Sequence, residues 1–177
     1  MIQLVPPALS RVLAERQIPY ALIGAMALAR HGAARYSADV DLLTLRPEVL
    51  SADFWVGFPS VPALRRGDVE DPLEGVVRWS GPRPVDLIVG KGPAMAFAVQ
   101  TASQDEELGI PVVSPLGLFL LKLEAGGPQD RYDILSLVAA QRALNGASWL
   151  AEVAAREGLL SASARGVLEE LRALLRQ

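Results

Sequence analysis

Three aspartates lie in two apolar stretches of the sequence that are compatible with β-strands. Residues 39–45 read DVDLLTL, and residues 84–89 read PVDLIV. Because side chains alternate along a strand, Asp39 and Asp41 would project from one face of a sheet and their apolar neighbours from the other. Asp86 is a single acid among apolar residues, where a carboxylate is costly without a partner. We therefore expect the three carboxylates to share one site.

Carboxylates held this close repel each other unless a cation neutralises them. Oxygen-only ligands suit hard ions such as Mg²⁺ or Mn²⁺. The sequence contains no cysteine and a single histidine, which excludes thiolate chemistry and disfavours zinc. We predict that Asp39, Asp41 and Asp86 form a metal site. The alternative, that aspartates near strand ends only cap turns or contact solvent, stays open for each of them.

A glycine turn precedes the aspartates. Residues 20–23 form a short apolar stretch that ends at Gly24, and the small residues 25–30 are typical of a helix that Gly32 can terminate. The first amides of such a helix and its positive dipole end can bind an anion such as a triphosphate. By itself this turn is a weak indication, and it gains weight from the aspartates that follow it.

Hydrophobic periodicity, together with Gly and Pro residues that end helices and strands, indicates the elements that would position these residues. A helix is expected at 8–17, strands at 20–23 and 39–45, and a further strand at 84–89, after which we expect the sheet to end. Residues 67–80 favour a hairpin of two short strands around an Asp71-Pro72 turn, the second strand at 75–79.

The last third of the chain is expected to be helical. Ser114 is suited to an N-cap and Pro115 to the first helical position, with the helix continuing to residue 124. Gly126, Gly127 and Pro128 interrupt the pattern. Apolar residues at spacings of three and four then predict helices at 129–143, 148–157 and 163–176.

These elements predict an α+β fold, with a mixed sheet flanked by helices and a C-terminal helical region. Residues 1–112 would form the α/β core and residues 113–177 the helical region packed on it, as one compact unit. The 177 residues are 51% hydrophobic and 21% charged, which is typical of globular proteins. We expect a soluble cytoplasmic protein without a membrane span. The net charge of −3 gives no general attraction to nucleic acid.

Several motifs resemble the nucleotidyltransferase superfamily. They are LIGA at 22–25, RxSxDVDL at 35–42 and VDL at 85–87, in the family's order and spacing. Residues 20–41, together with KLxAG at 122–126 and DxxDI at 130–134, are similar to the AbiEii-type and related small nucleotidyltransferases of toxin–antitoxin and phage-defence operons. The resemblance covers roughly residues 8–140.

The resemblance implies a metal-dependent enzyme that transfers a nucleotide from an NTP to a hydroxyl of RNA (tRNA included), a protein or a small molecule. Asp39 and Asp41 would hold two divalent ions, Mg²⁺ or Mn²⁺, and Asp86 would complete the metal site and assist deprotonation of the acceptor. The backbone at Gly24 and Ala25 would contact the NTP phosphates. A cognate antitoxin or toxin is a possible protein partner within such operons.

Further residues receive supporting roles from the same resemblance. Lys122 would neutralise phosphate charge, and Asp130 and Asp133 would orient Lys122 or its helix. Arg35 and Ser37, in the loop before the metal strand, would contact the nucleotide. Simpler readings stay open: the Lys122 ammonium extends to solvent, Asp130 favours the helix dipole, and Ser37 caps a turn.

The chain departs from the family pattern at two places. Many members have Gly-Gly or Gly-Ser where this chain has Gly24 and Ala25, and related sequences often have an arginine where residues 126–128 read GGP. Either change could accompany weakened catalysis. The alternative function is therefore a nucleotidyltransferase-like module that binds a nucleotide or a protein partner without turnover.

Overall fold

The structure, a computed structural model, describes residues 4–68, 73–145 and 148–175. Its centre is a seven-stranded mixed sheet in the order β3-β4-β5-β2-β1-β7-β6. The strands are β1 (Ala21–Leu22), β2 (Val40–Thr44), β3 (Ala63–Arg66), β4 (Leu73–Trp79), β5 (Val85–Gly90), β6 (Ser103–Asp105) and β7 (Ile110–Val112). The pairs β2–β5 and β1–β7 are parallel, and the other neighbouring pairs are antiparallel.

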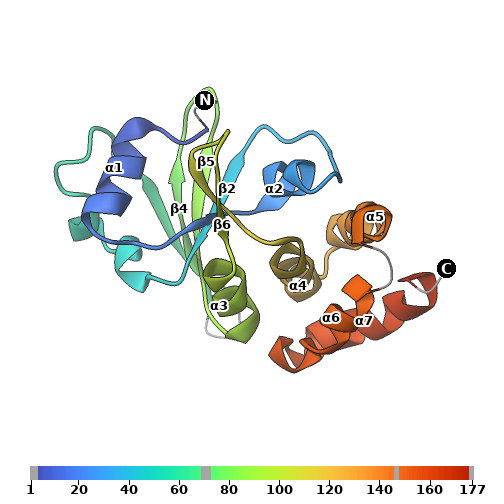
Figure 1. Cartoon of the computed structure of the whole chain (residues 1–177). Coiled ribbons are helices and arrows are strands. Elements are labelled where there is room, and N and C mark those ends of the chain that lie inside the picture. The colour runs from blue at the N-terminus through green and yellow to red at the C-terminus, as the bar shows by residue number, and fades with distance from the viewer. Residues whose placement is uncertain (1–3, 69–72, 146–147, 176–177) are drawn as a thin grey trace.

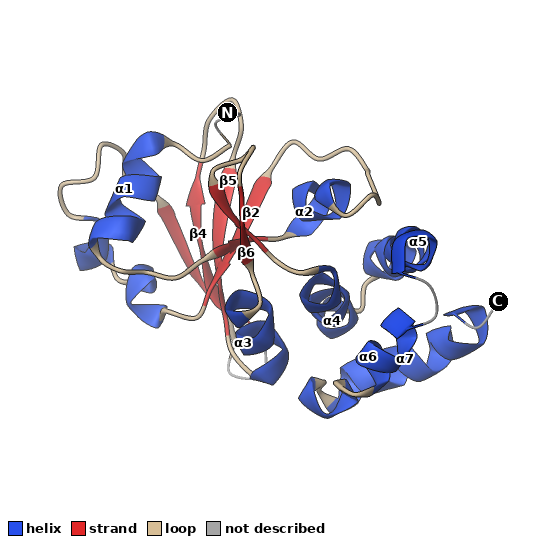
Figure 2. Ribbon diagram, viewed as in Figure 1, coloured by secondary structure: helices blue, strands red, loops and turns tan. Residues whose placement is uncertain are grey.

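Helices cover both faces of the sheet, and on the face opposite the N-terminal helix further helices form a second layer (Figure 1). The α-helices are α1 (Pro7–Glu15), α2 (Gly24–Arg30), α3 (Pro93–Gln100), α4 (Pro115–Ala125), α5 (Pro128–Asn145), α6 (Ser148–Ala154) and α7 (Ala162–Leu175), and the short 3₁₀ helices are η1 (Pro47–Leu50), η2 (Ala52–Trp55) and η3 (Glu157–Leu159). Helix α1 lies on one side of the sheet and α2, α3 and α4 lie on the other (Figures 1 and 2). This arrangement confirms the α+β class with a mixed sheet flanked by helices.

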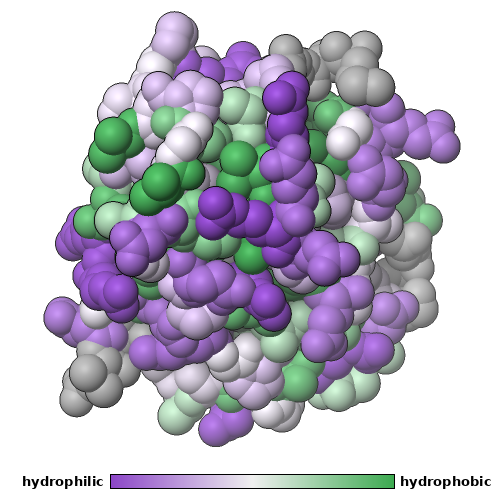
Figure 3. All heavy atoms as spheres, turned by 90° about the vertical axis from the view of Figure 1, so that its left-hand side faces the viewer, coloured by the Kyte–Doolittle hydropathy of each residue, from purple (hydrophilic) through white to green (hydrophobic). Residues whose placement is uncertain are grey.

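The face on the α1 side is mostly apolar. The Trp55 ring from η2 packs edge-on against Trp79 of β4, with 4.8 Å between the ring centroids. Leu9 and Leu13, one α-helical turn apart, are fully buried beneath α1. The outer surface on this side is mainly hydrophilic, with scattered apolar patches (Figure 3). The opposite face of the sheet is therefore the one left to carry polar groups.

Helix α4 connects the sheet to the C-terminal helices. It contacts α2, α3, α5 and α7, and every side chain from Leu116 to Leu123 is buried. Ser114 caps its N-terminus by accepting a hydrogen bond from the Gly117 amide (3.1 Å), with Pro115 following at the first helical position, as expected. Gly126 ends α4 in the left-handed conformation.

The sequence led us to expect that the sheet ends after β5, and this expectation is wrong. A helix, α3, and two further strands, β6 and β7, follow before α4 begins. Strand β7 pairs in parallel with β1, so it belongs to the interior of the sheet, and β6 forms an edge. The first hairpin strand is also displaced: it is β3, at Ala63–Arg66, and not a segment within 67–80. The expected Asp71-Pro72 turn lies outside the described residues.

Within the described part of the chain, no helix combines the length and apolar character needed to cross a bilayer.

Candidate active site

Strand register gathers the central residues of the site into one row across the sheet. Asp41 on β2 is directly opposite Asp86 on β5, which is directly opposite Arg78 on β4. Residues paired in this way project from the same face of a sheet. Asp39 comes just before β2, two residues from Asp41, and its carboxylate reaches the same arginine. The row therefore contains all three aspartates and one cation.

Asp41 lies at the inner end of this row, beneath the beginning of α2. Burial raises the pKa of the Asp41 carboxyl, and the nearby Asp86 and Asp39 carboxylates raise it further. Lys122 and Arg35 act in the opposite direction but more weakly. Asp41 is thus held where its negative charge is poorly compensated by the protein alone.

Gly24 is the residue that packs directly against Asp41. Its φ of 67° is in the left-handed region that side chains other than glycine rarely adopt. A Cβ at this position would overlap the Asp41 Oδ2 atom. Both the turn into α2 and the close approach of the carboxylate therefore require glycine here. Ala25, the next residue, has its side chain buried at the start of α2.

Arg78 bridges the other two aspartates. Its Nη1 atom donates to Asp86 Oδ2 at 3.0 Å, and its Nη2 atom donates to Asp39 Oδ2 at 3.4 Å. Burial raises the pKa of Asp86, Arg78 lowers it and Asp39 raises it again. The other Asp86 oxygen, Oδ1, is buried and has no hydrogen-bond partner. One face of this carboxylate is therefore still without a compensating group.

Arg78 belongs to none of the sequence motifs, and an arginine on a hairpin strand is most often solvated. Its position opposite Asp86 depends on the antiparallel register of β4 and β5. Alternation along 73–79 indicates which face Arg78 occupies, but it does not indicate the residue opposite. A hairpin register anchored at the β4–β5 turn could have identified the pair.

Lys122 belongs to a second polar cluster, between α4 and α5. Its Nζ atom lies 2.7 Å from Asp130 Oδ1 and 2.8 Å from Asp133 Oδ2. Asp130 also accepts a hydrogen bond from the Gly127 amide at the start of α5. Lys122 is buried and paired, so its ammonium does not extend to solvent. Asp130 combines the two roles considered for it, as a partner of Lys122 and as an acid in the first turn of a helix.

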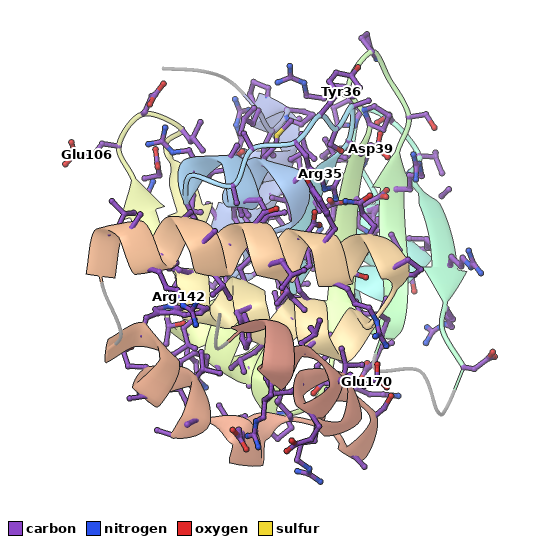
Figure 4. The ribbon with its side chains drawn as sticks, turned by 90° about the vertical axis from the view of Figure 1, so that its right-hand side faces the viewer. Arg35, Tyr36, Asp39, Glu106, Arg142 and Glu170 are labelled. Carbon is purple, nitrogen blue, oxygen red and sulfur yellow. The ribbon has the colours of Figure 1, made fainter. Side chains whose placement is uncertain are left out.

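Arg35 joins the same cluster from the loop before β2. Its Nε atom donates to Asp133 Oδ1 at 3.0 Å, and Gln129 donates to that oxygen as well. Burial opposes ionisation of Asp133, but Lys122, Gln129 and Arg35 together lower its pKa. Figure 4 shows Arg35 and Asp39 in the loop that precedes β2, close to α5. Ser37, in the same loop, donates to the Asp39 carbonyl at 3.5 Å, a local turn contact.

A cavity of about 220 Å³ opens between the aspartate row and the Lys122 cluster. Gly24, Asp41, Lys122 and Asp130 contribute to its wall. The rest of the lining is largely apolar and comes from the sheet, α3 and α4: Ile23, Leu43, Leu73, Ile88, Met95, Leu118, Leu121 and Ala125. Residues predicted separately from the sequence therefore line one cavity: Gly24 at the start of α2 and Asp41 on β2, and Lys122 and Asp130 from the helices that follow the sheet.

The three aspartates have the donor chemistry of a divalent-ion site but are not arranged as a complete one. Among the residues that the structure describes, no three His, Cys, Asp or Glu side chains are gathered as a ligand set. Arg78 bridges Asp39 and Asp86. The donor chemistry nevertheless fits Mg²⁺ or Mn²⁺, because the groups are carboxylates on one face. The unpartnered Asp86 Oδ1 and the raised Asp41 pKa are both features that a cation would relieve.

The backbone is similar to those of solved nucleotidyltransferases, and this similarity defines the fold class. ANT(2″)-Ia in complex with adenylyl-2″-tobramycin matches with a TM-score of 0.50 and 14% identity, over 96% of this chain and 93% of that chain. A nucleotidyltransferase-like protein from Paracoccidioides brasiliensis matches with a TM-score of 0.45 and 17% identity, over 89% of this chain and 88% of that chain. No family profile and no curated protein matches the sequence. Identities this low show the fold alone.

Proposed function

We propose that this protein is a metal-dependent nucleotidyltransferase that moves a nucleotide from an NTP to a hydroxyl acceptor. The observation that carries the proposal is the in-register pair of Asp41 and Asp86. This pair lies beside Asp39 on one sheet face, and Asp41 lines a cavity that also contains Lys122. On a nucleotidyltransferase fold, acids and a cation around one cavity suit a reaction that handles phosphate charge.

The acids would have two tasks in this reaction. Asp39, Asp41 and Asp86 would hold Mg²⁺ or Mn²⁺, which when bound would neutralise carboxylate and phosphate charge. Asp86 would also accept the proton of the acceptor hydroxyl. The acceptor oxygen then bonds to the α-phosphorus as the bond from that phosphorus to the bridging oxygen breaks, and pyrophosphate leaves. Asp41, held by its contact with Gly24, would keep the reacting groups in register.

The nucleotide would occupy the cavity between the aspartates and α4. Lys122 supplies positive charge there, and Asp130 and Asp133 hold its ammonium in place. The backbone at Gly24 and Ala25 would lie along the phosphates. Arg35 and Ser37 would act at the rim, where Arg35 would have to share its guanidinium between Asp133 and the nucleotide.

The acceptor is the least constrained part of the proposal. The solved ANT(2″)-Ia complex contains an adenylylated antibiotic, which makes a small molecule one candidate beside tRNA or a protein. The finer resemblance, to AbiEii-type proteins, adds a cytoplasmic role in a toxin–antitoxin or phage-defence system, with a cognate antitoxin or toxin as partner. A neighbouring gene for a winged-helix antitoxin would support that role, and co-purification of the two products would test it.

A second candidate function is binding without catalysis. The three cations around the site, Arg35, Arg78 and Lys122, are each paired with carboxylates in this structure. Ala25 and the GGP sequence at 126–128 also depart from the pattern of active relatives. Such a module would bind a nucleotide or protein partner and would consume no NTP.

Calorimetric titration with nonhydrolysable NTPs, in Mg²⁺ and then in EDTA, separates these functions. We expect binding that requires Mg²⁺ and is lost in the Asp39→Asn, Asp41→Asn double variant. Asp53→Asn is a matched control, because Asp53 is exposed on η2. Binding that is equal in EDTA and in the double variant would contradict the metal role. Mg²⁺-dependent binding without any turnover of labelled NTP would favour the second candidate.

A further inference from the structure

We infer that Arg78 is an exchangeable counter-ion of the active-site carboxylates, and that it has to release Asp39 and Asp86 before they can ligate a divalent metal ion. This inference rests on the metal dependence of the proposed function. It assigns a positioning role to a residue that neither the sequence motifs nor the fold comparison singles out.

The guanidinium of Arg78 lies between two of the acids. It contacts Asp86 Oδ2 at 3.0 Å and Asp39 Oδ2 at 3.4 Å, so one side chain engages both acids at once. A forked, planar cation is well suited to bridge two carboxylates. Arg78 thus holds one oxygen of each of two carboxylates that would ligate a metal. The guanidinium and the metal would therefore compete for the same two acids.

The charges of the site do not balance. Five carboxylates lie in the two clusters, on Asp39, Asp41, Asp86, Asp130 and Asp133, and three cations accompany them, on Arg35, Arg78 and Lys122. With all groups ionised, the site has two negative charges in excess. Asp41 has no salt bridge among the described residues, and Asp86 Oδ1 lacks a partner. Arg78 thus neutralises the acids only partly. Once Arg78 has left, five carboxylates face two cations, and a divalent ion reduces the excess of three negative charges to one.

Arg78 is more exposed to solvent than Lys122. The Arg78 side chain is 46% exposed, whereas that of Lys122 is 11% exposed. A long side chain at the surface can rotate into water and keep its charge solvated, at little cost. Lys122 is buried and would have to give up its pairs with both Asp130 and Asp133. Arg78 is therefore the cation that can leave when a metal arrives.

The competing explanation is that Arg78 is an ordinary cross-strand partner that stabilises the β4–β5 pair. Such pairs contribute about 0.2–1 kcal/mol and have no connection with metal binding. The two explanations predict opposite effects on metal affinity. A fixed structural bridge helps to shape the site, so its loss would weaken metal binding. If Arg78 instead competes with the metal, its loss would strengthen metal binding.

Titration with Mn²⁺ alone, followed by electron paramagnetic resonance of the free ion, distinguishes them. We expect Arg78→Gln to bind Mn²⁺ roughly tenfold more tightly than the native chain, about 1.4 kcal/mol. Arg65→Gln is the matched control for net charge. Arg65 is an exposed arginine on the neighbouring strand β3, and it has no salt bridge among the described residues. Its variant should change the affinity by less than about twofold.

The unfolding temperature, measured with and without Mn²⁺, is a second test that a general loss of structure in the variant would not pass. In EDTA, Arg78→Gln should unfold at a lower temperature than the native chain, because two carboxylates lose their cation. Added Mn²⁺ should raise its unfolding temperature by more than it raises that of the native chain.

Each outcome decides the question. Native Mn²⁺ binding with equal or weaker binding by Arg78→Gln would overturn the inference and leave the proposed function intact. If Arg65→Gln binds Mn²⁺ more tightly by the same factor, the change in affinity comes from net charge alone, and the inference about Arg78 is overturned. Absence of Mn²⁺ binding by both the native chain and Arg78→Gln would contradict the metal dependence itself.

Discussion

Gly24 and Asp41 occupy mutually dependent positions, and this contact leads to the first prediction. We expect Gly24→Ala to lower the free energy of unfolding by about 3 kcal/mol, from the left-handed backbone and from displacement of the Asp41 carboxylate. NTP binding should be lost with it. Urea unfolding and calorimetry measure the two effects.

Gly57→Ala is the control for the backbone contribution. Gly57 has a φ of 82°, but a Cβ there would meet no atom within 4 Å. Its cost should be about 1–2 kcal/mol, with NTP binding retained. If the two variants lose equal stability and both bind NTP, the Asp41 contact is unimportant.

The raised pKa of Asp41 makes its ionisation a cost to the metal-free protein. A carboxyl with a raised folded pKa stabilises the fold fully below the unfolded value of 3.8, and that contribution is lost as pH rises through the folded pKa. Asp41→Asn should therefore raise the free energy of unfolding at pH 7 in EDTA, by about 1 kcal/mol.

The stability gained by Asp41→Asn should shrink as pH falls towards 3.8, the ordinary pKa of an aspartate. Urea unfolding at several pH values would follow it, with Asp53→Asn as the exposed control. A gain that is the same at all pH values would point to a steric origin, and a loss at pH 7 would refute the cost of ionisation.

The sequence was sufficient to bring together the acids but not all of their partners. Alternation places Asp39 and Asp41 on one face, and the resemblance links Lys122 to Asp130 and Asp133. Arg78 comes from a strand whose register the sequence leaves open. The contact of Arg35 with Asp133 joins residues 98 positions apart, which no local pattern encodes.

At the scale of elements, the Lys122 cluster ties three segments together: α4, α5 and the loop before β2. Asp133 accepts from Lys122, Gln129 and Arg35, and its side chain is only 2% exposed. Removing the charge of Asp133 leaves Arg35 without its carboxylate and Lys122 with Asp130 alone. We expect Asp133→Asn to cost about 3 kcal/mol at pH 7, measured by urea unfolding.

The pH dependence of this cost has the opposite sign to that of Asp41. The pKa of Asp133 is lowered, so its stabilisation is present above the unfolded value of 3.8 and is lost as pH falls through the folded pKa. Glu107→Gln, which breaks an exposed pair with Arg30, should cost less than about 1 kcal/mol. Equal costs for the two variants would show that burial of the cluster adds nothing.

Element prediction was accurate where periodicity or capping is strong, and it missed β6, β7 and α3. The Ser114 cap and the breaks at 126–128 mark α4 and α5 from sequence alone. Strands β6 and β7 have three residues each, β6 is polar, and β7 contains Pro111, so neither shows a strand pattern. Helix α3 is uniformly apolar and lacks a polar face, although Pro93 after Gly92 is typical of a helix start.

For the molecule as a whole, the question is whether the α/β part and the C-terminal helices unfold together. Helix α7 contacts α4, and Leu168 of α7 is 3% exposed. In a Trp149→Phe background, the remaining tryptophans, Trp55 and Trp79, report on the sheet side. If the chain is one cooperative unit, Leu168→Ala should lower the stability reported by these tryptophans by about 2–5 kcal/mol.

Glu169→Ala, next to it on the exposed side of α7, should cost less than about 1 kcal/mol in the same background. An unchanged tryptophan transition in Leu168→Ala, together with a separate loss of helical circular dichroism at lower urea, would show that the helical region unfolds on its own.

The two outer strands of the sheet have a consequence for the behaviour of the chain in concentrated solution. Unpaired strand edges are templates on which other chains can add strands and aggregate. Here one edge is β3, which is exposed throughout and carries the adjacent charges of Arg65 and Arg66. The other edge, β6, is short and polar, and its Asp105 is paired with Arg30. Both ends of the sheet thus disfavour fibril-like association.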